Sequence, residues 1–151
     1  MGVRITYSVP LDEAIEDTVK RIRQQVEARS YEAANELRNS SLEILRGQRS
    51  GRRYRIPGKK VYYTASAPGE PPAARSGLFR ISWQPTALKE GNTYISRVES
   101  DLEVGTKKTY LLGEILEKGT PGGRMAPRPY QDKILEHAEP KIVRIYSEPY
   151  Y

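Results

Sequence analysis

The feature that most constrains the fold is a stripe of apolar residues through the first third of the chain. Its members are Ile15, Val19, Ile22, Val26, Ala33, Leu37 and Ile44, at steps of three, four or seven. This spacing places them on one face of an α-helix. We expect the helix to open at Pro10 and Leu11, with Ser8 as its cap, and to end near Arg46 and Gly47.

A helix of this length would span roughly 50 Å at about 1.5 Å per residue. That is long for a chain of 151 residues, which is the size of one domain. Three interpretations are open. Part of the apolar stripe faces another subunit, the helix breaks near Ser30, or the whole stripe is an ordinary core helix.

The remaining pattern predicts shorter elements. Strands are expected over residues 3–7, 61–65 and 94–102, and helices over 111–118 and 130–146, with Gly119 ending the former. Residues 79–83 alternate like a strand, although the segment could begin as a helical turn. Pro140 should kink or divide the last helix. Because helices and strands do not alternate regularly, we expect a single, mainly antiparallel α+β domain over residues 1–151.

Positive charge is concentrated in the middle of the chain. The net charge is +6, yet residues 46–80 alone hold nine basic groups against one acidic group. Glycine, serine and proline are frequent there, which predicts an extended basic loop over residues 46–77. Its cations are candidate contacts to a neighbouring subunit or to DNA: Arg46, Arg49, Arg52, Arg53, Arg55, Lys59 and Lys60. The alternative is a solvated flexible loop without a partner.

Nothing in the sequence indicates catalysis, a cofactor or a metal site. The chain has no cysteine and one histidine, His137, which we expect to be a solvated surface residue of the last helix. Gly119, Gly122 and Gly123 are not followed by the Lys and Ser/Thr of a phosphate loop. No apolar run is long enough for a membrane span or a signal peptide. We therefore expect a soluble protein, made in the cytoplasm, that is not an enzyme.

Two segments carry a resemblance to a known family. The first is SAPGEPPAARSGL at residues 66–78, and the second combines a turn with the entry to the last helix. Leu116, Glu117, Gly119 and Thr120 match the turn; Met125, Arg128, Pro129 and Tyr130 match the helix entry. In this order and spacing, over about residues 60–138, the chain resembles the siphophage tail-completion or head-to-tail joining family of neck proteins.

The resemblance implies a structural virion protein at the junction of head and tail. Family members form a hexameric ring between the head connector and the tail, so the expected partners are further copies and other neck and tail proteins. DNA passing through the channel would be contacted without sequence preference. The proline-rich segment would be an inter-subunit loop, made of Pro68, Gly69, Glu70, Pro71 and Pro72. Glu117, Arg128 and Tyr130 would make contacts at the turn and at the entry to the last helix.

Two other functions remain open. A tail terminator is also a ring-forming neck protein and differs in its location in the particle. A free nucleic-acid-binding protein would agree with the pI near 9.5 and the arginine-rich loop.

Overall fold

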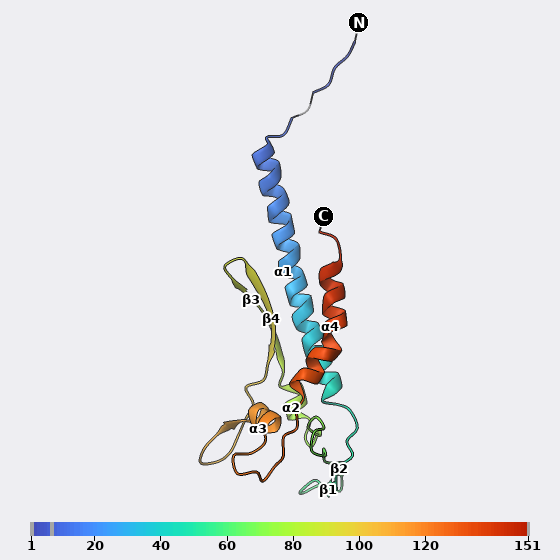
Figure 1. Cartoon of the computed structure of the whole chain (residues 1–151), viewed down its shortest axis with the longest axis vertical. Helices are drawn as coiled ribbons and strands as arrows, with labels where there is room; N and C mark the ends of the chain where they lie inside the picture. The colour runs from blue at the N-terminus through green and yellow to red at the C-terminus, as the bar shows by residue number, and fades with distance from the viewer. Residues whose placement is uncertain (1, 7, 151) are drawn as a thin grey trace.

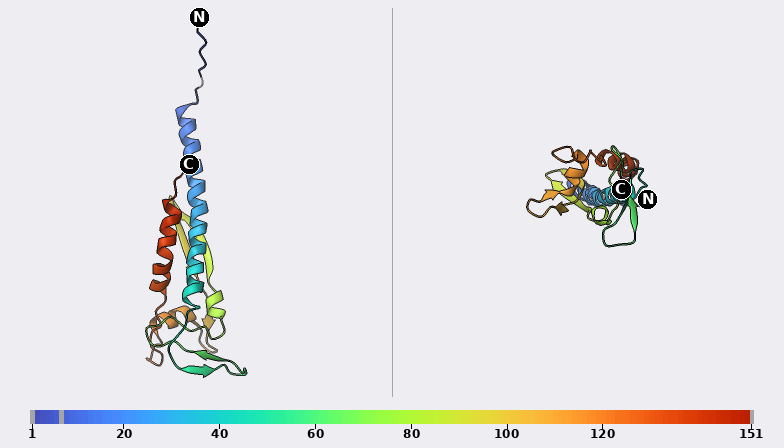
Figure 2. Two further views of the ribbon diagram at one scale, coloured as in Figure 1. Left: turned by 90° about the vertical axis from the view of Figure 1, so that its right-hand side faces the viewer. Right: turned by 90° about the horizontal axis from the view of Figure 1, so that it is seen from below.

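The protein is elongated, and two helices form its long axis. A computed structural model describes residues 2–6 and 8–150. Helix α1 (Leu11–Ile44) runs most of the length of the molecule, α4 (Gln131–Ser147) lies beside it, and the β3–β4 hairpin packs against α1 (Figures 1 and 2). The hairpin is formed by β3 (Gln84–Glu90) and β4 (Thr93–Glu99).

The smaller elements gather at the end of the molecule opposite the N-terminus (Figure 1). They are β1 (Arg53–Arg55), β2 (Tyr62–Thr64), α2 (Leu78–Ile81), β5 (Glu103–Val104), β6 (Tyr110–Leu111) and α3 (Leu112–Lys118). The strands pair as three separate antiparallel hairpins, β1–β2, β3–β4 and β5–β6. The predicted α+β class is confirmed, with three small ladders in place of one larger sheet.

Helix α1 is unbroken over 34 residues, about 50 Å, so the interpretation that it breaks near Ser30 is wrong. The Ser30 hydroxyl bonds back to the Glu27 carbonyl at 2.7 Å within the same helix. Ser8 does not cap the helix either. The cap position is Pro10, which offers no side-chain hydrogen bond.

Small residues of α1 are buried where this helix packs against α4 and the β3–β4 hairpin. The fully or almost fully buried positions are Ser30, Ala33, Ala34, Ser40 and Ser41 of α1 and Ala138 of α4. Small side chains let neighbouring backbones approach α1 closely: Ser96 of β4 donates to the Ser30 carbonyl at 2.8 Å, and Ser40 lies against His137 of α4. Arg29 fastens the far end of α4, where its guanidinium donates to the carbonyls of Glu148 and Pro149 and stacks 3.9 Å from the Tyr150 ring centre.

Pro140 does not divide α4, which runs without interruption from Gln131 to Ser147. A proline inside a helix removes one backbone hydrogen bond, normally at the carbonyl four residues earlier. Here both Pro140 and Glu136 are exposed. Water can therefore hydrate the carbonyl that is left without a helical partner.

The segment before β4 differs from its prediction. Residues 79–83 do not form a strand. They begin as the helical turn α2, after Gly77 at φ +80°, which was the alternative interpretation. Strand β3 was not predicted. It pairs with β4 over seven positions, from Gln84↔Glu99 to Glu90↔Thr93. Strand β4 itself was predicted within residues 94–102.

The predicted N-terminal strand is wrong for the residues that can be described. Residues 3–6 have no regular structure, and Val3 and Ile5 are 95% and 91% exposed. Tyr7, the third apolar position of the pattern, lies outside the described residues. A strand needs a partner for its backbone N–H and C=O groups, and residues 3–6 extend away from the body (Figure 1).

An aromatic core connects the two helices to the smaller elements. Trp83 and Tyr130 pack with Leu45 and Ile134, and Phe79 completes an aromatic trio. The three ring centres lie 5.5–5.7 Å apart with edge-to-face geometry, an arrangement favoured by the ring quadrupoles.

Candidate assembly interface

The segments that carry the family resemblance meet in space at the end opposite the N-terminus. The amide of Gly69, in the proline-rich segment, donates to the Pro127 carbonyl at 3.3 Å. Lys133, in the first turns of α4, donates to the Gly69 carbonyl at 3.2 Å. Segments about 60 residues apart in the sequence are therefore parts of one folded unit.

Glu117 organises the entry to α4 from within the chain. Its Oε2 accepts hydrogen bonds from the amides of Tyr130 and Gln131 at 2.9 and 3.3 Å. A carboxylate at a helix N-terminus satisfies free N–H groups and complements the helix dipole. The preceding residue, Leu116, accepts from the Arg128 amide at 2.7 Å. Glu117 was expected to make a contact at the turn and helix entry, and within the chain it caps the start of α4.

The Tyr130 side chain is also directed into the body of its own chain. Its side chain is buried in the aromatic core, and its hydroxyl donates to the Gly113 carbonyl at 3.0 Å. Burial raises the pKa of Tyr130 to about 12. Arg128 is half-buried, and its guanidinium lies 3.4 Å from the carbonyls of Ala126 and Pro127.

The proline-rich segment is folded against the body by Glu70. The Glu70 carboxylate accepts from the Ser50 hydroxyl, and from the amides of Ala67 and Ser50 at 2.8 and 3.1 Å. These bonds, the one from the Ser50 hydroxyl first, lower the pKa of Glu70 to about 2. Pro71 and Pro72 are buried, whereas Pro68 and Gly69 are exposed. Within this segment, Pro68 and Gly69 are therefore the residues that a partner could contact.

The basic segment is more ordered than the extended loop that was expected. It contains the β1–β2 hairpin, in which Tyr54 pairs with Tyr63. Arg49 points inward, where its guanidinium donates to the carbonyls of Ile44 at 2.7 Å and Pro72 at 3.2 Å. Burial lowers the pKa of Arg49. One of the seven candidate cations, Arg49, therefore connects the end of α1 to the proline-rich segment through hydrogen bonds within the chain.

The other six candidate cations are exposed: Arg46, Arg52, Arg53, Arg55, Lys59 and Lys60. Two of them lie over tyrosine rings of the hairpin, Arg53 at 4.8 Å from Tyr62 and Arg52 at 5.7 Å from Tyr54. The ion pairs found among residues 2–6 and 8–150 are Arg97–Glu99 and Lys141–Glu36. The hairpin therefore presents positive charge that forms no ion pair with a carboxylate of the described residues.

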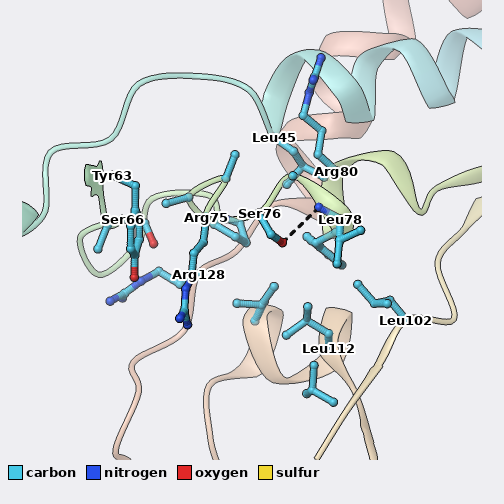
Figure 3. A pocket seen from close by; sticks show the side chains of 18 of the residues that line it. Leu45, Tyr63, Ser66, Arg75, Ser76, Leu78, Arg80, Leu102, Leu112 and Arg128 are labelled. Atoms are coloured by element: carbon cyan, nitrogen blue, oxygen red, sulfur yellow. Dashed lines mark hydrogen bonds between the residues drawn. The ribbon is translucent and has the colours of Figure 1, made fainter. Parts of the chain in front are cut away.

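Sequence reasoning missed a groove beside this hairpin. The groove encloses about 760 Å³ and lies between the hairpin, the proline-rich segment, α2, α3 and β5. We call it the basal groove. Figure 3 shows Leu78, Leu102 and Leu112 facing its interior and Arg75 and Arg128 near Tyr63. No local pattern reveals it, because its lining comes from six stretches that are separate in the sequence.

The charges around the basal groove are mostly positive. Lys59, Arg75 and Arg128 line it, and Glu103 is its one acidic lining residue among those described. Arg80 also belongs to the lining, but its side chain runs toward α1, where Nε donates to the Leu42 carbonyl at 2.8 Å (Figure 3). The groove is thus apolar inside with three cations available at its rim.

Comparison with known proteins gives no relative: no protein-family model, curated protein or solved structure matches the chain. None of the helices among the described residues is long and apolar enough to cross a membrane. The same residues contain no group of three or more His, Cys, Asp or Glu side chains that could hold a metal ion.

The expectation that His137 is a solvated surface residue is wrong. His137 is half-buried between α4 and α1, with Nδ1 3.0 Å from the Ser40 hydroxyl. Ser40 is completely buried. A serine nucleophile has to reach a substrate, so this pair is better described as a polar contact between two packed helices.

Proposed function

We propose that the chain is a structural, non-catalytic subunit of a ring in the neck of a tailed bacteriophage, and specifically a tail-completion protein that joins the head connector to the tail. The observation that carries the proposal is the meeting of the resembling segments at one end of the molecule. Gly69, Pro127 and Glu117 belong to separate stretches of the sequence, yet each bonds within one folded unit.

The distribution of exposed surface supports an assembly role. The end of the molecule that carries the resembling segments also presents the basic hairpin and the basal groove. At the other end, α1 extends beyond α4 and exposes apolar side chains. A subunit of a larger assembly has such surfaces because its partners cover them.

Deleting the coding sequence from the phage genome that contains it tests the proposal. We expect complete heads and complete tails to accumulate unjoined, as counted by electron microscopy of the lysate. Expression of the intact chain from a plasmid should restore joined particles. Joined, infectious particles in the absence of the chain would contradict the proposal, whereas a different location of the chain in the particle would point to the related tail terminator.

A second function, free nucleic-acid binding, is favoured by the six exposed cations of the hairpin region. Binding of a DNA duplex by the isolated chain, measured by fluorescence anisotropy at physiological salt, separates the two. We expect weak, salt-sensitive binding that the substitutions Arg52→Glu, Arg53→Glu and Arg55→Glu reduce. Nanomolar binding by a monomer would favour the second function.

A further inference from the structure

We infer that the start of α1 of one copy docks in the basal groove of a second copy, so that the chain joins to itself head to tail. The docking segment, residues 11–22, is called the tip. The inference rests on the proposed function, since it names the contact through which copies of the ring subunit would meet. Three properties of the two surfaces support it: apolar matching, opposite charge and position in the molecule.

The tip is an amphipathic helix without a covering partner. Leu11 and Ile15 are 75% and 53% exposed, and Val19 and Ile22 are 39% and 37% exposed. Their spacing places all four on one face. Helix α4 covers α1 only farther along, where the buried positions begin at Ser30. The apolar face of the tip therefore lies in solvent in the isolated chain.

The groove suits such a face. Its interior is formed by leucines from several elements, among them Leu78, Leu102 and Leu112. Apolar grooves of this kind accept amphipathic helices through side chains spaced three or four residues apart. A sugar–phosphate backbone would leave these leucines unmatched, which favours a protein segment over nucleic acid as the occupant.

Charge complementarity points the same way. The tip contains four carboxylates, at Asp12, Glu13, Glu16 and Asp17, against two cations, at Lys20 and Arg21, and all six side chains are exposed. By helical geometry, Asp12 and Glu16 lie beside the apolar face. The rim of the groove offers Lys59, Arg75 and Arg128. Docking the apolar face would therefore bring carboxylates toward cations.

The contact has to form between copies. The tip and the groove lie at opposite ends of one molecule (Figures 1 and 2), and α1 is continuous between them. A tip therefore cannot reach the groove of its own chain. Two different surfaces in contact make a heterologous interface, which forms a closed ring when the rotation between copies is suitable.

Disulfide trapping tests the contact directly, because the full-length chain has no cysteine of its own. One preparation contains Ile15→Cys in the tip, and the other contains Leu78→Cys in the groove. Both positions are exposed, so folding should be retained, as circular dichroism can verify. Mixed under mild oxidation, the two chains should form a heterodimer faster than either forms a homodimer.

A matched control uses the opposite side of the same helix. Asp17→Cys lies about 200° around the helix from position 15 and should trap little heterodimer with Leu78→Cys. Charge reversal supplies a second, independent readout. Asp12→Arg with Glu16→Arg in the tip chain, or Arg75→Glu with Arg128→Glu in the groove chain, should slow trapping about fivefold. Combining both reversals should restore the rate.

Equal trapping by Ile15→Cys and Asp17→Cys, or no rescue by the combined reversals, would overturn the inference. So would the absence of trapping together with retention of a DNA duplex through Arg75 and Arg128. These results leave the proposed function standing if the gene deletion still separates heads from tails. Conversely, the disulfide trapping could be specific while deletion of the gene still leaves heads and tails joined. That result would support the contact between copies and reject the proposed phage function.

Discussion

At the scale of single residues, several polar side chains satisfy backbone groups of their own chain. Arg49, Arg80 and Arg38 donate to the carbonyls of Ile44, Leu42 and Trp83, and Glu70 and Glu117 accept from backbone amides. The sequence shows that these residues are charged but not which way they point. This is why Glu117 could be predicted as a contact residue of the helix entry, whereas the two amides that it accepts from could not.

Glu70 should make stability depend on pH in the acid range. Its pKa is lowered from 4.5 to about 2 in the folded chain. The folded state therefore favours the ionised form, and the stabilisation is complete above about pH 4.5 and is lost as the pH falls through about 2. Glu70→Gln should lower the urea midpoint at pH 6, and the difference from the unmodified chain should shrink toward pH 2.

The control is Glu90→Gln, which changes an exposed glutamate at the end of β3. It should leave the difference in urea midpoint near zero across the same pH range. A Glu70→Gln chain that matches the unmodified chain at pH 6 would show that the bonds to Ser50 and Ala67 do not stabilise the fold.

At the scale of elements, helices and strands whose own residues show a periodic apolar pattern were predicted. Elements that form only because another part of the chain pairs with them were not. The long helix and β4 follow from the spacing of Ile15, Val19 and their successors and from the alternation in residues 94–102. Strand β3 contains Pro85 and the helix-favouring run from Ala87 to Glu90. It becomes a strand because the turn at Gly91, with φ +59°, aligns it with β4.

The candidate site was predicted in part for the same reason. The proline-rich segment and the helix entry are visible as contiguous motifs, so their residues could be listed from the sequence. The basal groove depends on how six separate stretches come together, and Leu78 or Leu102 carries no local signal for it. Likewise, the packing of α1 against α4 places Ser40 beside His137, two residues nearly 100 positions apart.

The packing of α3 against the aromatic core depends on the missing side chain of Gly113. A Cβ at that position would lie 2.8 Å from the Tyr130 hydroxyl. In most helices Gly→Ala is stabilising, but here we expect Gly113→Ala to destabilise by about 1–3 kcal/mol. Chemical denaturation followed by Trp83 fluorescence measures the change.

A second variant identifies the cause. Tyr130→Phe removes the hydroxyl and its bond to the Gly113 carbonyl, at a cost of about 1 kcal/mol. The double variant should then be more stable than the sum of the two single changes predicts, by about 1 kcal/mol or more. Strict additivity would mean that the hydroxyl is not what Gly113 accommodates.

At the scale of the whole molecule, stability should be uneven along α1. Its second half is buried against α4 and the β3–β4 hairpin, whereas residues 11–24 are almost entirely exposed. A helical segment without tertiary partners is marginal in water. We expect amides of residues 14–24 to exchange with deuterium much faster than those of residues 30–44, as measured by mass spectrometry on the isolated chain.

Occupation of the groove should change that profile. In the trapped heterodimer, the tip of the donor chain should become protected while its own residues 30–44 change little. Equal protection along the whole of α1 in the isolated chain would contradict the prediction, because it would require a partner for the tip that a single copy does not provide.

The unbroken course of α1 also has a mechanical consequence. One continuous helix runs from the outermost turns to Leu45 and the aromatic residues beside it, with no break in between. Over about 50 Å, a tilt of roughly 10° at one end displaces the other by about 9 Å. A partner that binds and stabilises the first turns of α1 therefore determines the orientation of the opposite end of the molecule.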